Sequence, residues 1–280
     1  MSSLGAAEAL ALAERCAMAA GAILVERFGR PAEGATTKSS ATDPVSDADR
    51  AAEAAIVSGL RAARPADRII AEEGGTGGDG SSGVSWFVDP LDGTANYLYG
   101  IPHWSVVIAC ADAGGALAGV VLDPLKGELF LASRGGGSWL RGPGSASGRR
   151  LSVTAVSDLS LALASTGFSY QAGERDRQGA ILATVLPRVR DVRRFGSAAL
   201  DLAWVAAGRH DVYFESVSHP WDWVAGALLV TEAGGRVSEL AAATGGEPRI
   251  VASGAALHEP LLALLRAAVQ TRADSLNLSR

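Results

Sequence analysis

The chain of 280 residues is 48% hydrophobic and carries a formal net charge of −5 at pH 7. This is enough apolar material for one large α/β domain or for two closely packed halves. The negative charge argues against nucleic acid as the main ligand, because phosphate backbones recruit clustered Lys and Arg. No apolar run approaches about 18 residues and no basic segment precedes the N-terminal apolar residues, so we expect neither a membrane span nor a signal peptide.

The two cysteines, Cys16 and Cys110, form neither a CxxC motif nor a disulfide framework. Such use of cysteine suits a reducing cytoplasm, and we expect both thiols to be buried packing residues.

The first half of the chain is predicted to contain two helices and then a largely antiparallel sheet. Apolar residues at helical spacing predict one helix that ends at Gly29 and a second that runs from Asp47 to Pro65. A short strand at 68–71 precedes a glycine-rich loop. Further strands are predicted at 105–111, 116–123, 128–133 and 138–141.

The most loop-like composition lies at 141–148, and we place a boundary there between halves 1–148 and 149–280. In the second half, strands are predicted at 160–166, 211–215, 236–240 and 250–253, and helices at 175–187, 197–207, 222–233 and 257–269. Residues 270–280 are expected to be a frayed tail.

The segment 86–94, Trp-Phe-Val-Asp-Pro-Leu-Asp-Gly-Thr, ends an apolar run with two carboxylates. Asp89 precedes a proline and is therefore biased towards extended geometry, so that a tight turn at Pro90-Leu91 can return Asp92 to the same side. The Leu91 carbonyl would add a third oxygen, and Mg²⁺ prefers such oxygen ligands. Taken alone, Asp-Pro and Asp-Gly are usually only turn formers.

Two other segments place an acid where an apolar element meets a turn. Glu72 and Glu73 follow the strand at 68–71, and Asp222 stands in Pro-Trp-Asp-Trp at 220–223. Residues 75–80 match GxGxxG, but no helix pattern follows, so a dinucleotide site is not expected. Nor does the chain contain G-x-S-x-G, a Walker lysine motif or H-E-x-x-H.

Together, the Glu-Glu pair, the Asp-Pro-Leu-Asp-Gly-Thr core and the Trp-Asp segment resemble, in order and spacing, the inositol monophosphatase family of Mg²⁺-dependent, lithium-sensitive phosphatases. The resemblance covers about residues 5–270. It implies one continuous α/β (α+β) domain built as a layered α-β-α-β-α sandwich, and commonly a homodimer.

The resemblance also implies the metal ligands. One Mg²⁺ would be bound by Glu72, Asp89 and the Leu91 carbonyl, and a second by Asp89, Asp92 and Asp222. A third, weaker ion would lie near Glu72, giving two to three ions in all. Two cations about 3.5–4 Å apart can activate water, neutralise phosphoryl charge and stabilise the leaving oxygen.

By the same resemblance, Thr94 and Asp49 activate the attacking water, with Glu72 and Asp92 as further catalytic residues. Without it, Asp49 would be read as an acid favoured by the dipole in the first turn of a helix, and Lys38 as a solvated loop lysine. His219, next to Pro220-Trp221-Asp222, is expected to be structural, with a place in the pocket lining as the alternative, and Trp221 is expected to anchor the loop that presents Asp222. The implied substrate contacts are Lys38, Asp92, Gly93, Thr94, Gly196, Ser197, Ala198, Glu215 and Asp222, with free N–H groups at the start of the helix after Gly196.

The predicted activity is hydrolysis of inositol 1-phosphate, a small phosphorylated polyol, to myo-inositol and phosphate in the cytoplasm. Ser197 after Gly196 favours this branch over histidinol phosphate, where an acid tends to follow the glycine. A fructose-1,6-bisphosphatase, which shares Gly-Ser-Ala-Ala, or a broad small-molecule phosphatase stays open. The non-enzymatic alternative is a regulatory or RNA-assembly partner that retains the fold.

Overall fold

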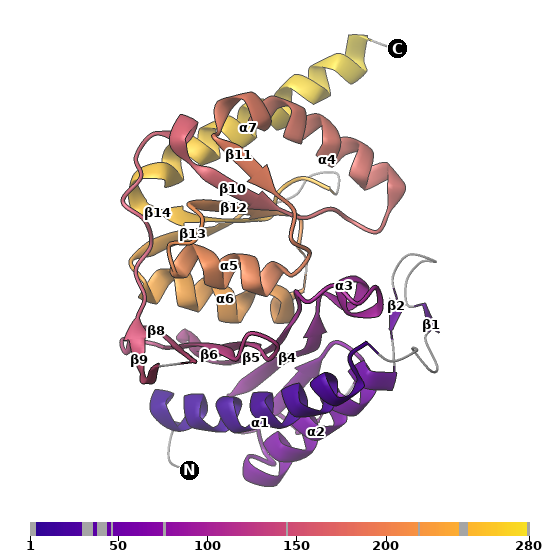
Figure 1. Ribbon diagram of the computed structural model, residues 1–280, viewed down its shortest axis with the longest axis vertical. Coiled ribbons are helices and arrows are strands. Elements are labelled where there is room, and N and C mark those ends of the chain that lie inside the picture. The colour runs from indigo at the N-terminus through magenta and orange to yellow at the C-terminus, as the bar shows by residue number, and fades with distance from the viewer. Residues whose placement is uncertain are drawn as a thin grey trace.

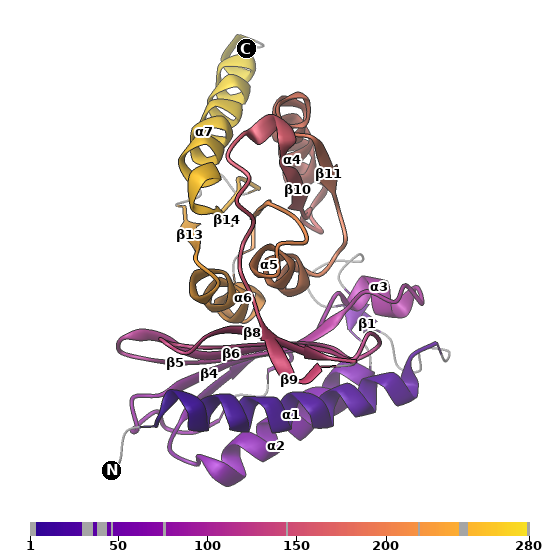
Figure 2. The same ribbon diagram turned by 60° about the vertical axis from the view of Figure 1, so that its left-hand side comes forward.

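A computed structural model describes residues 4–29, 36–37, 44–45, 47–74, 77–143, 145–217, 219–240 and 246–278. These residues form five stacked layers, helix pair, sheet, helix pair, sheet and helix pair (Figures 1 and 2). The layered α-β-α-β-α sandwich implied by the resemblance is therefore confirmed.

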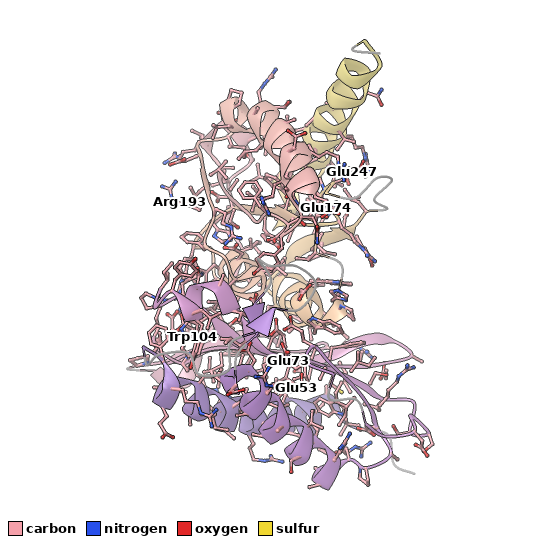
Figure 3. The ribbon with its side chains drawn as sticks, turned by 90° about the vertical axis from the view of Figure 1, so that its right-hand side faces the viewer. Glu53, Glu73, Trp104, Glu174, Arg193 and Glu247 are labelled. Atoms are coloured by element: carbon pink, nitrogen blue, oxygen red, sulfur yellow. The ribbon has the colours of Figure 1, made fainter. Side chains whose placement is uncertain are left out.

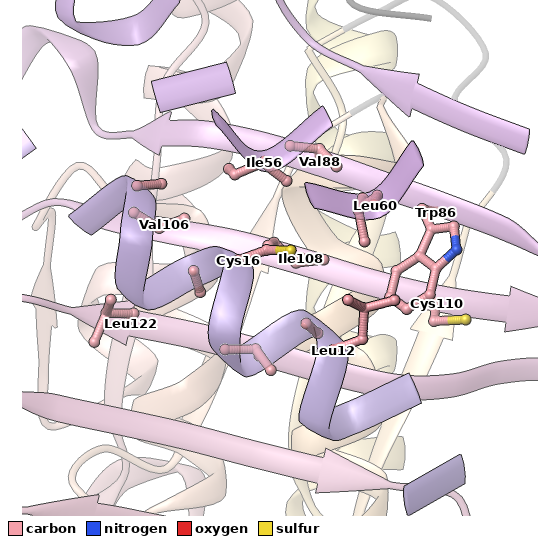
Figure 4. Close-up of a cluster of buried hydrophobic side chains, with 14 of the residues drawn as sticks. Leu12, Cys16, Ile56, Leu60, Trp86, Val88, Val106, Ile108, Cys110 and Leu122 are labelled. Atoms are coloured by element: carbon pink, nitrogen blue, oxygen red, sulfur yellow. The ribbon is translucent and has the colours of Figure 1, made fainter. Parts of the chain in front are cut away.

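The first layer consists of α1 (Ala6–Arg27) and α2 (Asp47–Ala63), which cover the outer face of the larger sheet. Their apolar faces meet Trp86 and Ile108 of that sheet in one buried cluster (Figure 4). Cys16 and Cys110 both lie in this cluster as buried free thiols, as predicted. Burying a Leu or Ile side chain of this kind stabilises the fold by roughly 1.5–3 kcal/mol.

The larger sheet has seven strands in the order β3-β4-β5-β6-β7-β8-β9. β3 and β4 are parallel and all the other pairs are antiparallel. Because parallel strands end at the same edge, the acids that follow β3 arrive beside those that end β4. The strands are β3 (Arg68–Ala71), β4 (Ser85–Asp92), β5 (Ser105–Asp112), β6 (Gly115–Asp123), β7 (Glu128–Ser133), β8 (Gly137–Gly142) and β9 (Ser145–Arg150).

The loop predicted at 141–148 is wrong, because the chain forms a hairpin there. β9 pairs antiparallel with β8 at the edge of the sheet, Trp139 opposite Arg150 and Gly142 opposite Ser145. A Ser- and Gly-rich strand at a sheet edge is held mainly by backbone hydrogen bonds, so its composition does not distinguish it from a loop. The chain then crosses to the second sheet. The division at residue 148 remains a prediction.

The second sheet has five strands in the order β11-β10-β12-β14-β13. β10 lies parallel to both β11 and β12, whereas β14 is antiparallel to its two neighbours. Apolar side chains of α5 and α6 fill the space between the two sheets, together with Tyr213. These strands are β10 (Leu163–Thr166), β11 (Asp191–Arg193), β12 (Val212–Glu215), β13 (Gly235–Glu239) and β14 (Ile250–Gly254).

The middle helices are α5 (Ala198–Ala206) and α6 (Pro220–Glu232), and the outer pair is α4 (Ala172–Val185) and α7 (Ala255–Leu278). The predicted frayed tail is wrong over 270–278, because α7 continues to Leu278. Short elements that the sequence did not indicate are β1 (Thr36–Thr37), β2 (Pro44–Val45), α3 (Thr94–Leu98), η1 (Leu159–Leu161), η2 (Leu186–Arg188) and β11. Among the helices described, none combines the length and apolar character that a bilayer crossing needs.

Candidate active site

A cleft of about 520 Å³ collects most of the predicted site residues from both halves of the chain. Residues that follow β3 and end β4 form one wall, and the ends of β12 and the start of α6 form another. The predicted residues that line it are Glu72, Asp89, Leu91, Asp92, Gly93, Thr94, Gly196, Ala198, Glu215 and Asp222. Asp49 and Ser197 lie buried behind this surface. Lys38 lies outside the described residues.

A bulge in β4 brings Asp89 and Asp92 to the same cleft. Asp89 is opposite Val107 of β5 and Asp92 is opposite Ser105, so β4 contains one extra residue between the two acids. In a regular strand, residues three apart point to opposite faces, and one inserted residue reverses this. The predicted tight turn at Pro90-Leu91 is thus a bulge within a continuous strand.

Gly93 follows the last residue of β4 in a left-handed conformation, with φ 95° and ψ 34°, and α3 begins at the next residue. A Cβ at this position would lie 3.1 Å from the Gly196 carbonyl oxygen and 3.2 Å from that of His103. Glycine is therefore favoured both by the backbone conformation and by the close approach of two other segments.

The Thr94 hydroxyl has two acceptors within reach. Its Oγ1 lies 3.0 Å from the Leu91 carbonyl oxygen and 3.4 Å from Oδ1 of Asp49, which reaches the site from α2 and is fully buried. One hydroxyl proton serves one acceptor at a time. The Asp49–Thr94 pair expected from the resemblance is therefore adjacent in the structure.

The Asp92 side chain lies beside the first turn of α5, where it accepts hydrogen bonds from several donors. The Ser197 hydroxyl donates to its Oδ2 over 2.5 Å, and the backbone N–H groups of Ala199 and Ala198 donate over 2.9 and 3.3 Å. The expectation that Ala198 offers a free N–H to substrate is therefore wrong. Burial raises the pKa of Asp92 to about 6, although these hydrogen bonds oppose the shift.

The other acids repel one another. Burial, followed by the charges of Glu72 and Asp92 and a hydrogen bond with Glu72, raises the pKa of Asp89 well above its usual value. Burial and then Glu72, Asp92 and Glu215 do the same to the pKa of Asp222. Among the described residues that line the cleft, Arg194 is the only Lys or Arg.

Such a concentration of partly desolvated carboxylates fits a divalent cation, which would offset their mutual repulsion and which prefers oxygen ligands. In the described part of the chain, no three Asp, Glu, His or Cys side chains are already arranged to hold one ion. The donor chemistry therefore suits Mg²⁺, while ion binding would have to draw the carboxylates closer together.

Glu215 ends β12 on the opposite side of the cleft. The Tyr213 hydroxyl donates to its Oε2 over 3.1 Å. Burial raises the pKa of Glu215 to about 7, while Arg194 and the Tyr213 hydrogen bond lower it. This carboxyl group is thus a hydrogen-bond acceptor whose charge depends on its neighbours.

Several residues of the cleft wall were not predicted. His219 and Trp221 both line the cleft, with their rings stacked at 4.5 Å and an interplanar angle of 2°. Pocket lining was only the alternative for His219, and Trp221 was expected to be a loop anchor. Arg194 lies near Gly196, where a Cβ would be 2.4 Å from its Nη1. The only sequence signal for these residues was their closeness to Asp222 and Gly196. Other unpredicted residues of this wall include Phe168, Tyr170 and Glu174.

Comparison with known proteins gives one consistent result. The model of the inositol monophosphatase family matches residues 6–270. The Nus factor SuhB of Pseudomonas aeruginosa is 42% identical over 235 residues, covering 82% of this chain and 84% of that protein. The inositol-1-monophosphatase SuhB of Mycobacterium tuberculosis is 42% identical over 248 residues, covering 86% and 84%.

Solved structures agree with this result. The extragenic suppressor protein suhB of Bartonella henselae superimposes with a TM-score of 0.80 at 36% identity, over 93% of this chain and 98% of that one. Mycobacterium tuberculosis SuhB gives 0.78 at 37% identity, over 94% and 98%. This chain therefore belongs to the inositol monophosphatase family, a family of phosphatases that are generally metal-dependent.

Proposed function

We propose that this protein is a Mg²⁺-dependent phosphomonoesterase of the cytoplasm that hydrolyses inositol 1-phosphate to myo-inositol and phosphate. The observation that supports this most is the meeting of Glu72, Asp89, Asp92 and Asp222 in one cleft, in a chain of this family. A concentration of carboxylates suits the binding of a cation that in turn receives a phosphate ester.

Glu72, Asp89 and the Leu91 carbonyl would hold one Mg²⁺, and Asp89, Asp92 and Asp222 a second. A third ion would lie near Glu72. When bound, the ions would supply an activated water and neutralise charge on the phosphoryl oxygens.

Thr94 and Asp49 would handle the proton of the attacking water. The Thr94 hydroxyl can turn from the Leu91 carbonyl towards Asp49, because the two acceptors lie 3.0 and 3.4 Å away. When the hydroxyl points towards Asp49, the Leu91 carbonyl oxygen loses this intramolecular hydrogen bond. The Thr94 oxygen could then accept a hydrogen bond from the attacking water. Asp49 is fully buried, so its role is to orient this hydroxyl and to accept charge.

Substrate hydroxyl groups would donate to Glu215 across the cleft. Gly93 and Gly196 line the cleft and would contact the substrate mainly through their backbones. Ala198 also lines the cleft, but its backbone N–H is hydrogen-bonded to Asp92. Lys38 is part of this proposal by resemblance only. Ser197 is buried and would act through its hydrogen bond to Asp92.

Phosphate release from a panel of esters tests the assignment. Inositol 1-phosphate, fructose 1,6-bisphosphate, histidinol phosphate and adenosine 3′,5′-bisphosphate are compared with Mg²⁺ and with EDTA, and inositol 1-phosphate should give the highest kcat/KM. A flat profile would remove the substrate assignment and leave a broad phosphatase. Equal release with and without EDTA would contradict the metal requirement. The proposal includes lithium sensitivity, so LiCl should inhibit more than NaCl at equal ionic strength.

A second candidate function comes from the names of relatives. Besides the Pseudomonas protein, the Nus factor SuhB of Xylella fastidiosa is 43% identical over 228 residues, covering 80% of this chain and 79% of that protein. This chain could thus also associate with RNA polymerase or nucleic acid. Capture of RNA polymerase by purified protein, with and without nuclease, distinguishes the two partners, and Asp92→Asn should leave such capture intact.

The homodimer also remains a proposal. Tyr99, 85% exposed, and Ile101, 47% exposed, follow α3 and give an apolar surface that a second copy could cover. Light scattering of wild type and of Tyr99→Ser with Ile101→Ser measures it. A monomer for wild type at micromolar concentration would contradict it.

A further inference from the structure

The Glu215 carboxylate occupies space that exists only because residue 167 is glycine. β10 and β12 are parallel, with Thr166 opposite Phe214, so the next residues, Gly167 and Glu215, are neighbours. A Cβ on Gly167 would lie 2.0 Å from Glu215 Oε1 and 2.1 Å from its carboxyl carbon. Side-chain atoms do not approach one another so closely, so any larger residue at 167 would displace the carboxylate.

This glycine is required by space and not by backbone conformation. Its φ angle lies outside the left-handed region in which glycine is favoured. Alanine can therefore adopt the same backbone, and Gly167→Ala changes the room available to Glu215 without straining the chain.

The cavity beside Gly167 is too small to receive the displaced Glu215 carboxylate. The cavity that Gly167 and Glu215 line together with Gln178 has a volume of about 10 Å³. That is room for about one water molecule and too little for a carboxylate. Displacement would therefore move Glu215 into the cleft or towards Arg194.

The second oxygen of Glu215 is held by Tyr213. Residues 213 and 215 are two apart on one strand and so point to the same face. Tyr213 is fully buried among apolar side chains of the middle layer, and its hydroxyl donates to Glu215 Oε2 over 3.1 Å. A packed ring gives the hydroxyl a fixed position, and a hydrogen bond to a charged acceptor is stronger than one between neutral groups.

We propose that Gly167 and Tyr213 together form the seat of Glu215 and thereby set the preference of this enzyme for polyol phosphates over simple phosphate esters. The inference rests on the proposed role of Glu215 as acceptor of substrate hydroxyl groups. Gly167 and Tyr213 are positioning residues, because they act through Glu215. A carboxylate held in one orientation before binding loses less conformational freedom when the polyol arrives.

The test compares inositol 1-phosphate, which has hydroxyl groups to recognise, with p-nitrophenyl phosphate, which has none. Gly167→Ala and Tyr213→Phe should each lower kcat/KM for inositol 1-phosphate by about tenfold, mainly through a higher KM. Hydrolysis of p-nitrophenyl phosphate should stay within about twofold of wild type. The ratio of the two kcat/KM values is the readout, since partial unfolding lowers both equally.

Two matched controls make the same chemical changes elsewhere. Gly179→Ala adds a methyl group in α4, where no described atom lies within 4 Å of the added Cβ. Tyr97→Phe removes another buried hydroxyl, which donates to the Leu24 carbonyl oxygen over 2.9 Å. Neither should change the ratio of the two kcat/KM values.

A double variant tests the route of action. In a Glu215→Gln background, adding Gly167→Ala should lower the ratio no further, because both changes act on the same contact. If Gly167→Ala fails to fold, Tyr213→Phe still tests the seat, since it keeps the ring and removes only the hydroxyl. A wild-type ratio in Gly167→Ala and Tyr213→Phe, together with a low ratio in Glu215→Gln, would overturn the inference and leave the proposed function intact. Equal losses on both substrates in Glu215→Gln would instead contradict the proposed role of Glu215.

Discussion

Asp92, the last residue of β4, caps the first turn of α5 through Ser197, whose hydroxyl donates to Asp92 Oδ2 over 2.5 Å. The same hydroxyl oxygen accepts the backbone N–H of Leu200 over 3.3 Å, as an N-cap side chain does. One carboxylate thus joins the larger sheet to the middle helices and lines the cleft. We therefore expect substitution of Asp92 to affect mainly catalysis and substitution of Ser197 to affect stability.

Asp92→Asn should lower turnover of inositol 1-phosphate by more than tenfold at saturating Mg²⁺, equivalent to about 1.4 kcal/mol of transition-state stabilisation. The reason is the loss of negative charge from the proposed ligand set, while size and one acceptor oxygen are kept. Circular dichroism should show a folded protein. Asp191→Asn, at an exposed acid paired with Arg193, is the control and should keep wild-type turnover. A tenth or more of wild-type activity in Asp92→Asn would contradict the metal assignment.

Ser197→Ala should lower the free energy of unfolding by about 1–2 kcal/mol, because it removes an N-cap and one donor to a buried carboxylate. Ser197→Thr keeps the hydroxyl and should retain most of that stability. Urea denaturation of the three proteins provides the measurement. Equal stability of Ser197→Ala and wild type would show that the backbone donors of α5 hold Asp92 without help.

Arg194→Gln should shift the pH dependence of polyol selectivity to higher pH. The pKa of Glu215 is about 7 and Arg194 lowers it, so removal of the guanidinium raises this pKa and leaves less carboxylate at neutral pH. The ratio of kcat/KM values for inositol 1-phosphate and p-nitrophenyl phosphate, measured from about pH 6 to about pH 9, should therefore rise later in the variant.

Arg193→Gln is the matched control for this experiment. Arg193 pairs with Asp191 and lies at the outer margin of the molecule, away from Glu174 of the cleft (Figure 3). The pH dependence of the kcat/KM ratio in Arg193→Gln should match that of wild type. The same shift in both variants would show a general effect of net charge and not a local one at Glu215.

The sequence predicted the residues of the cleft better than the way they are held. Asp89, Asp92 and Asp222 stand in short segments whose spacing is distinctive, and they do line one cleft. The capping of α5 by Asp92 depends on a contact between residues 105 positions apart, which no local pattern reveals. The seat of Glu215 likewise depends on strand register.

The same limit applies to the fold. Helices and inner strands with strong apolar periodicity were predicted within a few residues, because burial of one face determines them. The β8–β9 hairpin was missed because an edge strand needs little apolar side-chain surface. Glu53 of α2 and Glu73 illustrate a further contact that the sequence does not reveal. The Glu73 backbone N–H donates to the Glu53 carboxylate over 2.7 Å, and the two residues lie close together (Figure 3).

His210 should make the fold less stable at mildly acidic pH. Burial lowers its pKa to about 4, and its Nε2 lies 2.7 Å from the Asp201 carbonyl oxygen. The folded state keeps the imidazole neutral, whereas the unfolded chain binds a proton below about pH 6.5. The effect of His210 on the free energy of unfolding is therefore most favourable above about pH 6.5. As pH falls from there towards 4, the free energy of unfolding decreases by up to about 1.4 kcal/mol per pH unit.

The free energy of unfolding of wild type and His210→Gln, measured at pH 7 and pH 5, isolates this contribution. Gln can still donate to the Asp201 carbonyl but does not titrate. The loss between the two pH values should be about 2 kcal/mol smaller in the variant. The nearby Asp201 carboxyl, whose pKa burial raises well above its usual value, acts in the opposite direction in both proteins and so cancels in the difference. Equal losses would show that His210 is protonated in the folded state.

Asp222→Asn should stabilise the metal-free protein and at the same time weaken its response to Mg²⁺. Without an ion, burial and the charges of Glu72, Asp92 and Glu215 disfavour the Asp222 carboxylate, so replacing it with a neutral group relieves repulsion and should raise Tm in EDTA. In wild type, Mg²⁺ binds the folded state only and should raise Tm, with a gain of about 2.7 kcal/mol at 100 times Kd. Thermal unfolding of both proteins in EDTA and over a MgCl₂ series measures the two effects without any assay of activity. Asp191→Asn, at an acid outside the cleft, should show the wild-type response. A lower Tm of Asp222→Asn in EDTA would mean that Asp222 stabilises the metal-free fold. An unchanged Mg²⁺-dependent rise in Tm would mean that Asp222 is not part of the ion-binding set.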